Sequence, residues 1–300
     1  MPLAKRPAQA SAKKPAGTHV KAPVPRKKPG GKVGGKASAA ARADGAPGVS
    51  TCAKPSDRAI GSLTLSEDGV CFIGQALWQG TLGSVQQRVD SKVSEILRVI
   101  DERIADDAMD REQFKEVVCR DGGRLDIRYG MDEAVLLELA EAGAWMSVVR
   151  EYLGDSAVLL FSGVVLALGN LDGSDAQGQA WHSDGGHLYE HVDLPCHCLN
   201  VFVPLVDLDA SNGPTEFILG SHRLKAGPAG GGHCSVLSSR CHAGTAIVFD
   251  YRIKHRGSPN KTPSQRPMLY FTYCKPWFID HQNHRSQASI FERAPQAAAP

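Results

Sequence analysis

The sequence predicts a mainly β domain with packed helices, in which helical segments come first and an antiparallel β-sandwich or barrel follows. The helical evidence is a series of branched apolar residues from Val85 to Ile104 at spacings of three and four. The β evidence is a set of short segments after residue 157, rich in β-branched and aromatic residues. Because no helical pattern separates these segments, we expect them to pair antiparallel.

Each element is predicted from its local pattern. The segment Ser66–Gly69 predicts a turn, and residues 70–73 a short strand. Ser84 is a suitable N-cap for a helix over 85–104, and a second helical stretch over 132–153 breaks near Gly143. Further strands are expected over 157–168, 199–208, 215–219, 244–251 and 268–274.

Charge is unevenly distributed along these 300 residues, although the formal total is only +2. Residues 1–50 carry 11 Lys and Arg and one acidic residue, whereas the remainder carries 23 basic and 31 acidic residues. Ala, Lys, Pro and Gly dominate residues 1–50, which cannot bury enough apolar area to offset the entropy of ordering. We therefore expect a disordered basic arm over 1–58, a folded domain over 59–285 and a disordered tail over 286–300.

The arm contains the basic run Pro25–Lys32, which is compatible with nuclear import, phosphate contact or an organelle address, and also with no specific partner. No aromatic residues lie among its charges, so a nucleic-acid partner is open but not favoured. No apolar run reaches the roughly 18 residues of a membrane span, and no apolar stretch follows the first Met. Eight Cys are too few for a disulfide scaffold. We expect an intracellular, cytoplasmic protein, with nuclear or organellar targeting by the arm as alternatives.

The segment QAWHSDG, residues 179–185, contains a candidate pair of metal ligands. His182 and Asp184 are two residues apart, so on an extended chain their side chains point to the same face. His255, directly after a predicted strand, can supply a second imidazole. Two His and one carboxylate on one face of an octahedral metal leave three positions open, which is typical of non-haem Fe(II) oxygenases.

Arg266 lies 11 residues beyond His255, at the start of the next predicted strand. A hairpin would bring its guanidinium back beside the metal, where it can bind a carboxylate bidentately. The C5 carboxylate of 2-oxoglutarate suits this position, because its C1 carboxylate and C2 ketone can chelate the iron. The implied cofactors are Fe(II), 2-oxoglutarate and O2, with ascorbate as an in vitro reductant.

Four stretches of the sequence resemble the phytanoyl-CoA dioxygenase family of Fe(II)/2-oxoglutarate oxygenases. They are QAWHSDG (179–185), NGPTE leading to GSHR (212–223), GT before a strand ending in DYR (244–252), and HRGSPN leading to RP (255–267). The resemblance implies a double-stranded β-helix, or jelly roll, with helices packed on one sheet. It implies iron ligation by His182, Asp184 and His255, and 2-oxoglutarate anchoring by Arg266 with help from Ser258. Because related halogenases lack the carboxylate that Asp184 provides, hydroxylation or a related oxidation is favoured.

Three functional interpretations stay open at this point. The first is a 2-oxoglutarate-dependent dioxygenase that hydroxylates a small organic molecule or an acyl substrate, with Gln179 and Trp181 as candidate pocket residues. The second is a non-catalytic metal-binding barrel whose basic arm mediates binding or targeting. The third is a metal enzyme of the same fold that does not use 2-oxoglutarate.

A dense group of His and Cys over residues 185–198 lies next to the predicted ligands, where a lid would lie. The group is compatible with a loop with buried thiols, a redox role for the thiols, or a structural zinc site. Its spacings do not match the usual paired C-x2-4-C pattern, so zinc is the less favoured hypothesis.

Overall fold

The structure, a computed structural model, describes residues 54–55, 60–105, 114–170, 178–223, 235–281, 283 and 288–292. Most of the predicted basic arm and part of the predicted tail lie outside these residues, so both disorder predictions stay predictions there. Among the described helices, none has the length and apolarity to cross a membrane.

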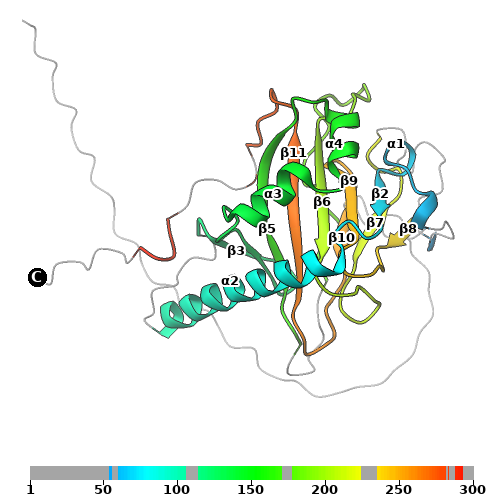
Figure 1. The fold of residues 1–300 in the computed structure, drawn as a ribbon. Helices are drawn as coiled ribbons and strands as arrows, with labels where there is room; N and C mark the ends of the chain where they lie inside the picture. The colour runs from blue at the N-terminus through cyan, green and yellow to red at the C-terminus, as the bar shows by residue number, and fades with distance from the viewer. Residues whose placement is uncertain are drawn as a thin grey trace, which may run out of the picture. The chain divides into compact units, whose positions relative to one another are not determined.

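Two β-sheets form a jelly-roll core in the described domain (Figure 1). The strands are β1 (Lys54–Pro55), β2 (Val70–Ile73), β3 (Val117–Arg120), β4 (Arg124–Ile127), β5 (Val158–Ala167), β6 (Cys198–Pro204), β7 (Thr215–Ile218), β8 (Ser235–Ser238), β9 (Ala246–Asp250), β10 (His255–Gly257) and β11 (Arg266–Cys274). The larger sheet has the order β2-β9-β6-β11-β5-β4-β3, and the smaller has the order β1-β8-β7-β10. Every strand pair is antiparallel except β1 with β8.

Helices α2 (Gln79–Ala105), α3 (Ala134–Ala142) and α4 (Met146–Leu153) cover the outer face of the larger sheet, and the short helix α1 (Leu65–Asp68) lies beside β2 (Figure 1). A 3-10 turn over Ile60–Ser62 precedes them. One face of α2 buries Val85, Val89 and Ile96 in the same core as Val201 of β6 and Phe271 of β11. This apolar layer stabilises the larger sheet from outside and leaves its inner face for the cavity described below.

The structure confirms the predicted class and the main elements. The five strands expected after residue 157 are β5, β6, β7, β9 and β11, and the strand expected over 70–73 is β2. The helical stretch over 132–153 is divided into α3 and α4, and the N–H of Gly143 donates to the carbonyl of Leu139 at the break.

Two local predictions are wrong. Helix α2 begins at Gln79, and the N–H of Leu82 already donates to the carbonyl of Trp78, so Ser84 lies inside the helix and does not cap it. Residues Ser66–Gly69 mostly form α1, because the Thr64 hydroxyl accepts from the N–H of Glu67 and Gly69 ends the helix with a φ of 79°. Strands β1, β3, β4, β8 and β10, which have two to four residues each, are not among the predicted strands.

The expected hairpin between His255 and Arg266 is also wrong. His255 begins β10 in the smaller sheet, whereas Arg266 begins β11 in the larger sheet. Strand β10 pairs with β7, with His255 opposite Phe217. The chain between the two residues therefore crosses from one sheet to the other, and they line one cavity from its two walls.

Part of the predicted tail is packed. The side chain of Ile290 is fully buried, and its carbonyl accepts hydrogen bonds from Arg103 of α2. The N–H of Lys115 donates to the carbonyl of Ala288. Residues 288–292 thus belong to the helical side of the domain, because burying Ile290 there contributes apolar area.

Candidate metal centre

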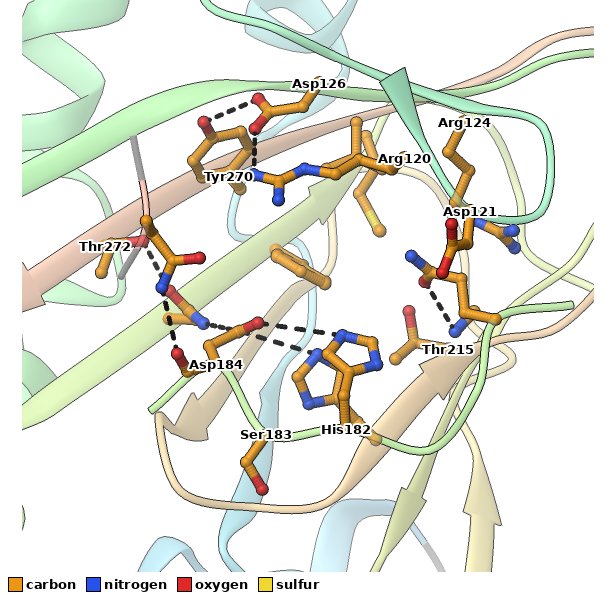
Figure 2. Close-up of a pocket in the computed structure, with 18 of the residues that line it drawn as sticks. Arg120, Asp121, Arg124, Asp126, His182, Ser183, Asp184, Thr215, Tyr270 and Thr272 are labelled. Carbon is orange, nitrogen blue, oxygen red and sulfur yellow. Dashed lines mark hydrogen bonds and ion pairs between the residues drawn. The ribbon is translucent and has the colours of Figure 1, made fainter. Parts of the chain in front are cut away.

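The side chains of His182, Asp184 and His255 meet at one point between the sheets. Figure 2 shows His182 and Asp184 at this point. His182 and His255 are opposite each other in an antiparallel bridge, with reciprocal N–H···O=C distances of 3.0 and 2.8 Å. The Nε2 atom of His182 lies 3.8 Å from Oδ1 of Asp184, and Nε2 of His255 lies 3.6 Å from Oδ2. The backbone bridge therefore brings together two residues that are 73 positions apart.

Both imidazoles turn their Nε2 atoms toward the carboxylate. Nδ1 of His182 lies 2.9 Å from the carbonyl of Ala180, and Nδ1 of His255 lies 3.1 Å from the carbonyl of Ile253. A carbonyl only accepts, so each Nδ1 carries the proton and each Nε2 has a free lone pair. Burial lowers the pKa of His255, although Asp184 acts in the opposite direction. A neutral imidazole is the form that binds a metal.

The three residues fit a single metal ion. One ligand atom from each lies within 4.8 Å of the others, so the three side chains converge on one point. Two imidazole nitrogens and one carboxylate oxygen are the donor set of non-haem Fe(II) oxygenases. In the described part of the chain, this is the only group of three or more His, Cys, Asp or Glu residues that could hold a metal.

The His and Cys residues of 185–198 do not assemble into a second such group. Cys196 and Cys198 are buried free thiols, and burial raises the pKa of both. The ring of His197 is buried against Phe278 and has no hydrogen-bond partner for either nitrogen. The zinc hypothesis for this segment is therefore not supported, and the segment contains buried thiols.

A cavity of about 460 Å³ adjoins the three residues. The β3–β4 hairpin contributes several charged residues to its wall, and β11 contributes Arg266 and Tyr270. Figure 2 shows Arg120, Asp126 and Tyr270 across the cavity from His182 and Asp184. None of residues 185–198 lines the cavity, so the predicted lid does not cover it in this structure.

Two buried guanidinium groups lie in this wall without a carboxylate partner within the described residues. Arg266 is 1% exposed, its Nε atom has no hydrogen-bond partner, and its Nη1 atom lies 3.6 Å from Sδ of Met268. Arg124 donates to the main-chain carbonyls of Gly122 and Ser258. Burial and the nearby Arg124 lower the pKa of Arg266 to about 9, and burial lowers that of Arg124 to about 10. An anion bound here would offset this cost of burying charge.

Other candidate residues take different positions. Gln179 lines the cavity, and its Oε1 atom accepts from the N–H of Gly257 at 3.1 Å. Trp181 packs against the guanidinium of Arg256, which lies 4.5 Å from its ring centre, and does not line the cavity. Ser258 does not line it either, and contributes its main-chain carbonyl to Arg124.

Sequence reasoning missed the residues of the β3–β4 hairpin. Arg120 donates to Oδ2 of Asp126 at 2.8 Å, and the Tyr270 hydroxyl donates to Oδ1 of the same carboxylate at 2.8 Å. The available signal was the sequence DGG at residues 121–123, where both glycines have positive φ. That turn joins two strands of only four residues each.

The sequence matches the family model described as phytanoyl-CoA dioxygenase over residues 65–268, which include the three clustered residues and Arg266. The chain belongs to the phytanoyl-CoA dioxygenase family. Among curated relatives in sequence, the dioxygenase easH of Epichloe festucae var. lolii is 34% identical over 96 residues. That match covers 31% of this chain and 51% of easH, so the chain spans about half the length of this relative.

Solved structures share the family fold at low sequence identity. AviO1 from Streptomyces viridochromogenes is 19% identical with a TM-score of 0.51, covering 72% of this chain and 94% of AviO1. The epimerase SnoN, solved in complex with Fe3+, alpha ketoglutarate and nogalamycin RO, is 15% identical with a TM-score of 0.51. That match covers 75% of this chain and 92% of SnoN. These likenesses concern the fold of the domain.

Proposed function

We propose that the chain is an Fe(II)- and 2-oxoglutarate-dependent dioxygenase that hydroxylates a small organic molecule or an acyl substrate. The observation that carries this proposal is the meeting of His182, Asp184 and His255 beside the buried Arg266 in one cavity. A metal site alone is compatible with many activities, but an unpaired guanidinium next to it calls for an anionic co-substrate. Family membership and the metal and alpha ketoglutarate bound by SnoN support the same cofactors.

In this proposal His182, Asp184 and His255 hold the iron through two Nε2 atoms and one carboxylate oxygen. The iron supplies the activation of O2, coupled to conversion of 2-oxoglutarate to succinate and CO2. Arg266 holds the C5 carboxylate of 2-oxoglutarate, and Arg124 adds a second positive charge at the same end of the cavity. Both are buried, so the interaction takes place away from bulk water, where it is stronger.

The substrate would occupy the remaining part of the cavity. A volume of about 460 Å³ lies within the usual range for small-molecule sites. Gln179 and Arg120 are polar wall residues that could orient a substrate, whereas Phe161 and Val165 offer apolar contact. This mixed lining favours a small molecule that has both polar and apolar parts.

The test is release of succinate from 2-oxoglutarate by the full chain with Fe(II), ascorbate and O2. We expect slow turnover without substrate, and faster turnover when a small-molecule library contains a substrate. His182→Ala should abolish both activities, because it removes a metal ligand. The matched control is His242→Ala, since this imidazole is exposed and pairs with Asp207 near the surface.

Three results separate the competing functions. Succinate release that needs both His182 and Arg266 supports the dioxygenase. Metal binding without succinate release, under conditions in which a known dioxygenase is active, would favour the non-catalytic barrel. If a library compound is oxidised at the same rate without 2-oxoglutarate and by Arg266→Met, the protein would instead be a metal enzyme of the same fold that does not use 2-oxoglutarate.

A further inference from the structure

The carboxylate of Asp184 is held by a buried amide from the larger sheet. The Nδ2 atom of Asn200 in β6 donates to Oδ2 of Asp184 at 2.6 Å. In turn, the hydroxyl of Thr272 in β11 donates to Oδ1 of Asn200 at 2.6 Å. Asn200 and Thr272 are directly opposite each other in the β6–β11 ladder, and both are 3% exposed.

The Asp184 carboxylate only accepts, so it selects the NH2 end of the Asn200 amide, and the Thr272 hydroxyl holds the amide in that orientation by donating to its oxygen. An asparagine side chain has an oxygen that only accepts and a nitrogen that only donates. With the hydroxyl donating to the oxygen, the NH2 group is directed at the carboxylate. Without that hydroxyl, the buried amide oxygen loses its donor, and the amide is no longer fixed against the carboxylate.

We propose that Asn200, held in place by Thr272, is the positioning residue that makes Asp184 bind the metal through one oxygen only. Both carboxylate oxygens face an imidazole, with Oδ1 3.8 Å from Nε2 of His182 and Oδ2 3.6 Å from Nε2 of His255. The hydrogen bond from Asn200 engages Oδ2 and fixes the plane of the carboxylate, which favours Oδ1 as the metal-binding atom. A carboxylate that used both oxygens would take one of the three positions that 2-oxoglutarate and O2 need. This inference rests on the proposed function, because it assumes the metal site.

Asp184 is also held through its main chain. The side-chain amide of Asn283 donates to the Asp184 carbonyl at 3.1 Å and to the Tyr251 hydroxyl at 3.0 Å. The Tyr251 hydroxyl donates to Asp280 at 2.5 Å. The backbone at Asp184 is therefore held independently of Asn200, so a change at Asn200 or Thr272 acts on the carboxylate orientation rather than on the position of the residue.

The experiment compares metal binding by full-length variants under anaerobic conditions, without turnover. Co(II) is the probe, because its visible absorption reports both affinity and coordination. Asn200→Leu removes the amide at similar size, Thr272→Val removes the hydroxyl at the same shape, and Thr272→Ser keeps the hydroxyl. We expect Asn200→Leu and Thr272→Val to weaken Co(II) binding about 10- to 100-fold and to change the absorption bands. Thr272→Ser should remain within about threefold of the unmodified chain.

Controls separate positioning from loss of fold. Thr245→Val makes the same change at another buried threonine that does not line the cavity, and should leave Co(II) binding unchanged. A purely structural role would lower the unfolding temperature of the metal-free protein and leave the Co(II) spectrum as it was. That result, or unmodified Co(II) affinity in Thr272→Val, would overturn the proposal. If the unmodified chain binds no Co(II), the proposed function itself fails, and this inference fails with it.

Discussion

Arg124 and Arg266 lie opposite the same residue, Ala167, on the two sides of β5. Arg124 pairs with Ala167 from β4, and Arg266 pairs with it from β11, so both side chains belong to one row across the larger sheet. Both line the cavity. Burial, and to a smaller extent repulsion by Arg124, lowers the pKa of Arg266. Such an arrangement is stable when an anion lies between or beside them.

The first prediction concerns the affinity for 2-oxoglutarate. Arg266→Met should weaken anaerobic binding of 2-oxoglutarate to the metal-loaded protein about a hundredfold or more. The reason is that loss of one partner of a buried ion pair costs about 3–5 kcal/mol. Arg124→Met should have a smaller effect, about tenfold, because main-chain carbonyls already accept two of its hydrogen bonds.

The control for both changes is Arg98→Met, which alters an exposed arginine on α2 that pairs with Glu102. It should leave 2-oxoglutarate affinity unchanged. Equal affinity in Arg266→Met and in this control would show that the buried guanidinium does not hold the co-substrate.

The second prediction concerns metal stoichiometry. Calorimetric titration of the metal-free chain with Zn(II) should reveal one metal-binding site, because the described residues contain one suitable group of ligands. Asp184→Ala should remove that site. A site that survives Asp184→Ala but is lost in a variant lacking Cys196 and Cys198 would restore the zinc hypothesis for residues 185–198.

The third prediction concerns the hydrogen bonds behind Arg120. Tyr270→Phe removes a hydroxyl that donates to the buried Asp126, and should lower the free energy of unfolding by about 1.5–3 kcal/mol. Denaturant unfolding measures this change. Tyr129→Phe removes a hydroxyl that donates to Glu95 in a more exposed setting, and should cost clearly less. Equal losses in the two variants would contradict this account of the Asp126 site.

The fourth prediction concerns the thiols. Among the cysteines described, Cys119 is exposed and should be alkylated by iodoacetamide at neutral pH, as peptide mass spectrometry can show. Cys196 and Cys198 should stay unmodified in the folded protein, because burial shields them and raises their pKa, which keeps them as unreactive thiols. Fast modification of Cys196 would instead support a redox role for that segment.

Features that depend on neighbouring residues in the chain can be predicted from the sequence alone. The spacing of His182 and Asp184 predicts a shared face without knowledge of the fold, because alternation along an extended chain is a local property. The helix break at Gly143 and the strands that contain Val201 and Phe271 are likewise local, since they follow from propensity and periodicity. Helix starts are less certain: the first turn of α2 precedes Ser84, since the apolar period marks only the buried part of a helix.

Residues that act through partners across a sheet are beyond such patterns. Nothing near Arg124 in the chain indicates that it will lie opposite Ala167, and nothing near Asn200 indicates Thr272, because strand register depends on the whole sheet. The same holds for His255 and Arg266, which line one cavity from two different sheets and not through the predicted hairpin. The sequence alone thus determines the motifs that supply candidate ligands, because each motif is a short stretch of chain. Only the folded sheet determines the burial, pairing and orientation of the side chains that support them.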